Sequence, residues 1–157
     1  MSVAEKKTPP VVVPFVDLKA QYRTIREEVR AAIDSIVEEA AFIGGKALHD
    51  FQDAFARYCG ARHGIGVSSG TSALHLALDA CGVGPGDEVV TVPNTFIATT
   101  EAITQAGATI RFVDADPESF NLDPAKLEAA ITPKTKAVMP VHLFGQTAEM
   151  DAILAIA

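Results

Sequence analysis

Strand-like and helix-like segments alternate along the chain from Gly64 onward, and this alternation constrains the fold more than any other feature. Four short runs rich in β-branched residues have the pattern of strands: GIGVSS (64–69), DEVVTV (87–92), TIRFVD (109–114) and KAVMPV (136–141). Helical patterns follow them and begin near Thr71, Thr95, Pro124 and Ala148. Such alternation predicts βαβ units with right-handed crossovers. The expected fold is therefore α/β, with a mainly parallel sheet and flanking helices.

The first part of the chain has a different pattern. Residues 1–13 are expected to form a flexible lead-in, because Pro9-Pro10 disfavours helix. From Asp17 onward, apolar residues recur every three or four positions as far as Ala40, which predicts an amphipathic helix with Asp17 as its N-cap. A second helix is expected to follow, with Gly60 as its end.

The charge and composition of the chain argue against some classes of binding partner. The 157 residues include 13 Lys and Arg against 20 Asp and Glu, a net charge of -7. This balance argues against a nucleic-acid partner or an anionic membrane surface. No stretch approaches the roughly 18 consecutive apolar residues of a membrane span, so we expect a cytoplasmic protein. Cys59 and Cys81 are predicted to be buried small hydrophobic side chains rather than a disulfide or metal ligands; no metal site is predicted.

The junction SSGTS, between the first strand pattern and the following helix, allows three interpretations. It can be an anion cradle, in which Gly70, Thr71 and Ser72 offer backbone N–H groups and hydroxyls at a helix N-terminus. It can be a nucleophile elbow, because GVSSG matches G-x-S-x-G with Ser68 at its centre. It can also be a well-capped helix start that binds nothing.

The elbow interpretation would need an acid and a histidine. Asp114 or Asp116 and then His142 follow Ser68 in the order of α/β-hydrolases. The simpler expectation is that the cluster of Asp114, Asp116 and Glu118 forms a solvated loop with helix-capping roles. For His142 the simpler expectation is a hydrogen-bonded structural role.

Other candidate residues follow the second and fourth strand patterns, whose carboxyl ends should meet at the edge of the sheet where ligands bind. Phe96 is placed either to stack on a flat heteroaromatic cofactor or to lie in the core. The residues expected on this rim are Thr95, Phe96, Ala98, Thr99, His142, Gly145 and Gln146.

Taken in order, the motifs resemble a known family. They are PFVDLKAQY, FIGG, SSGTSALHLAL, GVGPGDEVVTVPNTFIATTEAI, GATIRFVDADPESFNLDPAKLEAAITPKTKAVMPVHLFGQ and MDAI. This set, from about Pro14 to the last residue, resembles the DegT/StrS family of pyridoxal-phosphate-dependent nucleotide-sugar aminotransferases.

The resemblance implies a fold, a cofactor and site residues. Residues 14–157 would form the N-terminal portion of a type I pyridoxal-phosphate transferase large domain, preceded by N-terminal helices. Thr71 and Ser72, with Gly70 leading into them, match the positions that bind the cofactor phosphate, and Phe96 matches the aromatic residue that stacks on the pyridine ring. The implied substrates are a nucleotide-linked keto-sugar and an amino donor such as glutamate, for polysaccharide or antibiotic sugars. The implied assembly is a homodimer.

The chain departs from the family pattern in two places. No residue matches the aspartate that pairs with the pyridine nitrogen, and none matches the Schiff-base lysine; Lys46, Lys126, Lys134 and Lys136 lie outside the lysine motif. Transamination needs that lysine. We therefore expect no catalytic residue in these 157 residues and no activity from them alone, because the chain ends before the lysine motif. The alternatives are a non-catalytic truncated or regulatory homologue and, third, a hydrolase that uses Ser68.

Overall fold

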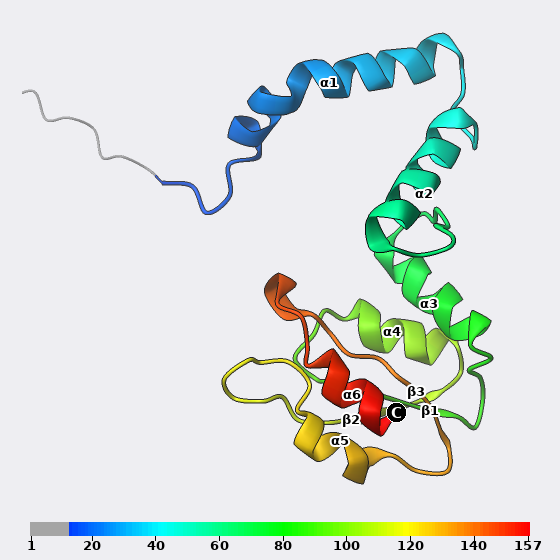
Figure 1. Cartoon of the computed structure of the whole chain (residues 1–157), viewed down its shortest axis with the longest axis vertical. Coiled ribbons are helices and arrows are strands. Elements are labelled where there is room, and N and C mark those ends of the chain that lie inside the picture. Colours follow the sequence, from blue (N-terminus) through cyan, green and yellow to red (C-terminus); the bar gives the residue numbers. More distant parts are fainter. Residues whose placement is uncertain (1–12) are drawn as a thin grey trace, which may run out of the picture. The chain divides into compact units, whose positions relative to one another are not determined.

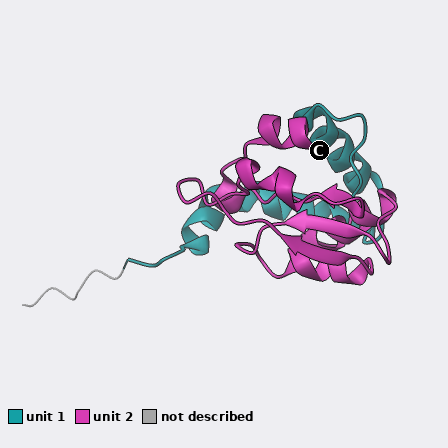
Figure 2. Cartoon of the chain, turned by 90° about the horizontal axis from the view of Figure 1, so that it is seen from below, with its two compact units in different colours: residues 1–66 teal, residues 67–157 magenta. Residues whose placement is uncertain are grey.

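The computed structural model describes residues 13–157, so the expected lead-in lies outside the described residues apart from Val13. The chain divides into two compact units, residues 1–66 and residues 67–157, coloured separately in Figure 2. Within residues 13–157, no helix has the length and apolar character needed to cross a membrane.

The first unit contains two helices, α1 (Leu18–Glu38) and α2 (Lys46–Cys59). Asp17 caps α1 as predicted, because its Oδ1 accepts a hydrogen bond of 2.9 Å from the backbone N–H of Ala20. Gly60 ends α2 in the left-handed conformation, with a φ of 65°, which glycine adopts without steric cost. Both predicted helix boundaries are therefore confirmed.

The second unit is a parallel sheet with helices, shown in Figure 1. Its strands lie in the order β2–β1–β3, and β1 pairs with both neighbours in parallel. The strands are β1 (Glu88–Thr91), β2 (Thr109–Phe112) and β3 (Thr135–Val138). The helices are α3 (Gly70–Ala80), α4 (Ala98–Gln105), α5 (Pro124–Ala130), α6 (Met150–Ile156) and the 3-10 turn η1 (Leu143–Gly145). The predicted α/β class with a parallel sheet is confirmed.

One predicted strand is absent. Residues 64–69 form no strand, and the side chain of Ile65 is 82% exposed. An extended segment becomes a strand only when a neighbour satisfies its backbone N–H and C=O groups. None of the three strands of the described chain pairs with residues 64–69. The prediction of a strand from the β-branched pattern at residues 64–69 was therefore wrong.

The central strand β1 is buried on both faces of the sheet. Val89 packs with residues of α3 and α4 in one apolar cluster, whereas Val90 packs with residues of α5 and α6 in another. Both valines are completely buried. Because successive side chains of a strand point to opposite faces, this alternation places two helices on each side of the sheet.

The predicted burial of the two cysteines is wrong. Cys59 and Cys81 are both exposed and form no disulfide. Cys59 is the last residue of α2, and Cys81 is the C-cap of α3. The residues at the end of a helix lie beyond the part of the helix that packs on its neighbours. An apolar side chain at such a position can therefore stay exposed.

A buried asparagine holds the segment that contains η1. The Asn121 side chain is 2% exposed. Its Nδ2 donates to the backbone oxygen of Gln146 at 3.1 Å, and its Oδ1 accepts from the backbone N–H of Leu143 at 3.0 Å. Between these two anchors, Phe144 and Gly145 both have left-handed φ angles, 55° and 83°. The carboxamide therefore fixes both ends of the turn and offsets the conformational cost of the left-handed backbone at Phe144.

We predict that Asn121→Ala destabilises the protein by about 1–3 kcal/mol, because it removes two part-buried hydrogen bonds to the backbone of Leu143 and Gln146. Urea unfolding followed by circular dichroism measures the change. The matched control is Asn94→Ala, since Asn94 is exposed, and it should change the free energy of unfolding by less than about 0.5 kcal/mol. Equal effects of the two substitutions would contradict the assigned role of Asn121.

Candidate functional site

The second unit contains a cavity of about 710 Å³ beyond the carboxyl ends of β1 and β3. Three segments line it: the start of α3, the residues between β1 and α4 with the first turn of α4, and the residues that follow β3 as far as Phe144 in η1. The lining residues are Gly70, Thr71, Ala73, Leu74, Thr95, Phe96, Ala98, Thr99, Met139, Pro140, Val141, His142, Leu143 and Phe144. This is the edge where parallel α/β sheets bind ligands.

The start of α3 presents hydrogen-bond donors to this cavity. Ser69 caps the helix, because its Oγ accepts from the backbone N–H of Ser72 at 3.1 Å. The N–H groups of Gly70 and Thr71 have no acceptor within residues 13–157. A Cβ added to Gly70 would meet no heavy atom within 4 Å, so its backbone borders open space. Free N–H groups at the positive end of a helix dipole suit an anion such as phosphate.

Ser72 occupies a different position from Gly70 and Thr71. It does not line the cavity. Its hydroxyl is hydrogen-bonded to Ser68 Oγ at 2.9 Å and to Ser69 Oγ at 3.1 Å. The structure therefore brings Gly70, Thr71 and Phe96 to one cavity and leaves Ser72 in the hydroxyl cluster that supports the helix start.

The nucleophile-elbow interpretation finds no support in this geometry. The hydrogen bond of the Ser68 hydroxyl is to Ser72, and no hydrogen bond joins Ser68 to a histidine in the described chain. His142 Nδ1 instead accepts from the backbone N–H of Ala148 at 3.1 Å. An elbow also needs a strand before the serine, and none is present at residues 64–69. A serine without its general base is not an activated nucleophile.

The carboxylates that the elbow would need have structural partners. Asp116 Oδ1 accepts from the backbone N–H groups of Ser119 at 2.7 Å and Glu118 at 3.0 Å. These contacts hold the pKa of Asp116 below its usual range, and the hydrogen bond from Ser119 has the largest effect. Asp123 caps α5 through the backbone N–H of Ala125 at 2.9 Å. Asp114 and Glu118 are exposed, as expected of a solvated loop, but the helix cap is Asp123 and not one of the three clustered carboxylates.

Phe96 lies on the cavity wall and not in the core. Its side chain is 75% exposed, which excludes the core alternative within this chain. Beside it, the Thr95 and Thr99 hydroxyls are hydrogen-bonded to each other at 2.8 Å. An exposed aromatic face next to helix N–H donors can hold a flat ring that carries an anionic group.

Sequence reasoning missed Phe144, which lines the cavity and is 96% exposed. The left-handed backbone at Phe144 is not readable from sequence, because it depends on the distant Asn121. Gly145 and Gln146, expected on the same rim, do not line this cavity. His142 does line it, and its hydrogen bond to Ala148 confirms the expected structural contact.

No lysine lines the cavity within residues 13–157. Asp50 raises the pKa of Lys46, and Asp123, with Asp114, raises the pKa of Lys126. An amine that acts as a nucleophile needs the opposite shift. Within the same residues, no group of three His, Cys, Asp or Glu side chains is placed to hold a metal ion.

Comparison with known proteins gives the chain its family. The pattern of the DegT/DnrJ/EryC1/StrS aminotransferase family matches residues 23–157. The chain is 50% identical over 145 residues, 92% of its length, to the pleiotropic regulatory protein of Geobacillus stearothermophilus. It is 57% identical over 113 residues, 72% of its length, to the GDP-perosamine synthase of Caulobacter vibrioides.

Solved structures agree. The chain is 45% identical to S. venezuelae DesV in complex with a ketimine intermediate, with a TM-score of 0.90 over 92% of this chain and 39% of that one. NtdA from Bacillus subtilis with bound cofactor PMP gives 37% identity and a TM-score of 0.85, over 98% of this chain and 35% of that one.

These matches cover only part of each relative. The chain spans 39% of the Geobacillus protein and 30% of the Caulobacter protein. The matched part is 92% of this chain for the Geobacillus protein and 72% for the Caulobacter protein, and 92% of this chain superimposes on the solved DesV structure. The chain belongs to the DegT/DnrJ/EryC1/StrS aminotransferase family.

Proposed function

We propose that this chain provides the phosphate-binding and ring-stacking part of a pyridoxal phosphate site in an aminotransferase that acts on nucleotide-linked keto-sugars. One observation carries the proposal: the free N–H groups of Gly70 and Thr71 and the exposed ring of Phe96 line the same cavity. These are the two features that a phosphorylated pyridine requires, an anion cradle and an aromatic face.

Each residue has a separate role in this proposal. Gly70 and Thr71 donate backbone N–H groups to the phosphate, and the Thr71 hydroxyl adds a further donor. Ser72 has an indirect role: its hydroxyl is hydrogen-bonded to the hydroxyls of Ser68 and Ser69 and so supports the helix start without contacting the phosphate. Phe96 covers one face of the pyridine. When bound, the cofactor supplies the electron sink for moving an amino group.

The names of relatives support the substrate class. One relative is a GDP-perosamine synthase, and a solved neighbour holds a ketimine intermediate. We extend this to a nucleotide-linked keto-sugar as acceptor, a glutamate-like amino donor, a homodimer and a cytoplasmic location. Because the chain spans about two-fifths or less of these relatives, the assignment applies to a protein in which other residues complete the site.

A regulatory protein without catalysis is the second candidate. The observation that favours it is the name of the Geobacillus relative, a pleiotropic regulatory protein. The two candidates differ in turnover: an aminotransferase consumes an amino donor and releases its keto acid, whereas a non-catalytic homologue does not. Measuring keto acid release from glutamate in the presence of a nucleotide-linked keto-sugar separates them.

We predict that Gly70→Ala weakens pyridoxal phosphate binding by about 1–3 kcal/mol, because the new methyl group enters space that the phosphate needs. Stability should not fall, since a Cβ at this position meets no protein atom. Gly84→Ala is the matched control, because a Cβ there also meets only open space and Gly84 does not line the cavity. Calorimetric titration with pyridoxal phosphate measures the affinity, and unchanged binding by the Gly70 variant would refute the cradle.

We predict that Phe96→Ala weakens cofactor binding by about 1–3 kcal/mol through loss of a stacked ring. Thr71→Ala should weaken it as well, because it removes a donor to a charged phosphate. The control is Phe112→Ala, since Phe112 is 53% exposed and lies away from the cavity lining. A spectral titration with pyridoxal phosphate compares the variants with the wild type. If Phe96 and Phe112 behave alike, Phe96 does not stack on the cofactor.

We predict that a fluorophosphonate probe does not label Ser68 above the level of a Ser68→Ala control, because no histidine activates this hydroxyl. Mass spectrometry of the treated protein measures the label. Stoichiometric modification of Ser68 would favour the hydrolase hypothesis over the aminotransferase.

A further inference from the structure

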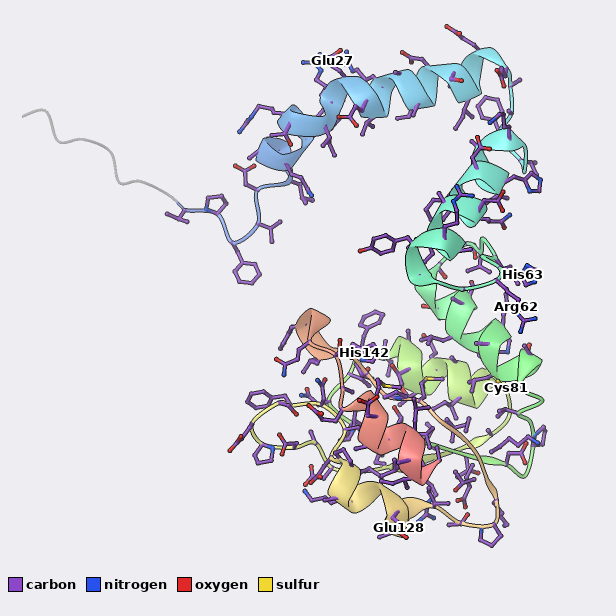
Figure 3. The ribbon with its side chains drawn as sticks, in the orientation of Figure 1. Glu27, Arg62, His63, Cys81, Glu128 and His142 are labelled. Atoms are coloured by element: carbon purple, nitrogen blue, oxygen red, sulfur yellow. The ribbon has the colours of Figure 1, made fainter. Side chains whose placement is uncertain are left out.

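His142 is a cavity-lining residue whose ring is held by the protein backbone. It lies between β3 and η1, near the start of α4 in Figure 3. Its Nδ1 accepts a hydrogen bond of 3.1 Å from the backbone N–H of Ala148. Ala148 is 3% exposed and belongs to the apolar cluster beside α5 and α6. The ring is therefore attached to a rigid part of the fold.

The hydrogen bond to Ala148 decides which ring nitrogen carries the proton. A neutral imidazole has one donor nitrogen and one acceptor nitrogen. Because Nδ1 accepts from Ala148, the proton of the neutral ring lies on Nε2. Nε2 has no acceptor among residues 13–157. The fold thus maintains a histidine donor without a partner on a residue of the cavity wall.

The backbone next to His142 is fixed as well. The N–H of Leu143, the following residue, donates to the buried Asn121 at 3.0 Å. Pro140, two residues before His142, restricts the chain on the other side. A donor positioned in this way loses little conformational entropy when a ligand binds, which is the property expected of a recognition group.

We propose that His142 binds ligand directly, with its Nε2–H donating a hydrogen bond to an oxygen atom of pyridoxal phosphate in the cavity. This inference rests on the proposed function and extends it to a residue that the phosphate cradle and Phe96 do not include. The acceptor belongs to one of two groups of the cofactor: the hydroxyl and aldehyde oxygens attached to its pyridine ring, or its phosphate. The neighbouring Thr95 and Thr99 hydroxyls already bond to each other, so His142 is the side-chain N–H donor of the cavity wall.

Two substitutions separate ligand binding from a purely structural role. In His142→Asn the carboxamide oxygen lies near the position of Nδ1, so the contact with Ala148 is kept and the ligand donor is lost. In His142→Gln the amide nitrogen reaches the position of Nε2, so the donor is kept and the contact with Ala148 is lost. His75→Asn is the matched control, because His75 lies on α3 beside Asp79 and does not line the cavity.

The test is a nuclear magnetic resonance titration of the complete protein with pyridoxal phosphate, followed on the imidazole nitrogens and on the backbone amides of Gly70 and Thr71. We expect the His142 Nε2–H signal to shift together with those amides. Affinity should fall about three- to tenfold in His142→Asn, as for one lost hydrogen bond, and less in His142→Gln. Titrations with inorganic phosphate and with pyridoxal identify the acceptor, because each probe presents only one of the two groups.

Three results would overturn the proposal. If the Gly70 and Thr71 amides shift while the His142 signal does not, His142 makes no ligand contact and the proposed function stands. If His142→Asn binds like the wild type while His142→Gln is impaired, the role of His142 is structural only. If neither the amides nor the imidazole respond to pyridoxal phosphate, the proposed function and this inference fail together.

Discussion

The site depends on a single buried hydroxyl at the carboxyl edge of the sheet. Thr91, the last residue of β1, is completely buried, and its Oγ1 donates to the backbone oxygen of Met139 at 2.8 Å. The backbone N–H of Met139 donates to Val90 at 2.8 Å, so the ladder between β1 and β3 continues one residue past the strand. The two chain segments that leave these strands form most of the cavity wall. The hydrogen bond from Thr91 to Met139 sets the distance between these two segments where they leave the sheet.

This anchoring explains how the cavity joins groups of different character. The polar donors come from the start of α3, where the backbone supplies two N–H groups and Thr71 adds its hydroxyl. The apolar surfaces come from loops after β1 and β3, where Phe96 and Phe144 are exposed by turns that the framework holds rigid. Rigid strands thus orient loop residues that have few contacts of their own, a common division between scaffold and binding loop.

Sequence patterns predicted most of the fold, because its elements follow local rules. The helix ends at Asp17 and Gly60 were readable from single residues, and the strands from β-branched runs. The missing strand at 64–69 shows the limit, since pairing needs a neighbour that local pattern does not reveal.

The site divides in the same way. The serine-rich junction and Phe96 were visible because their chemistry is local to a helix start and a strand end. Phe144 was not, because its placement depends on Asn121, far away in sequence. The exposure of Cys59 and Cys81 was missed because composition alone does not give the direction of a side chain at a helix end.

The central place of β1 also bears on how the chain folds during synthesis. In this sheet β1 is translated before both of its neighbours, and Val90 pairs first with Arg111 of β2 and later with Val138 of β3. Assembly can therefore proceed outward on the ribosome, each new strand joining an edge that already exists, and the cost of closing the longer loop rises only slowly with its length. Until β3 emerges, however, one edge of β1 offers unpaired backbone groups to any strand nearby. During the time between the synthesis of β2 and that of β3, wrong pairing of β1 with another strand competes with folding.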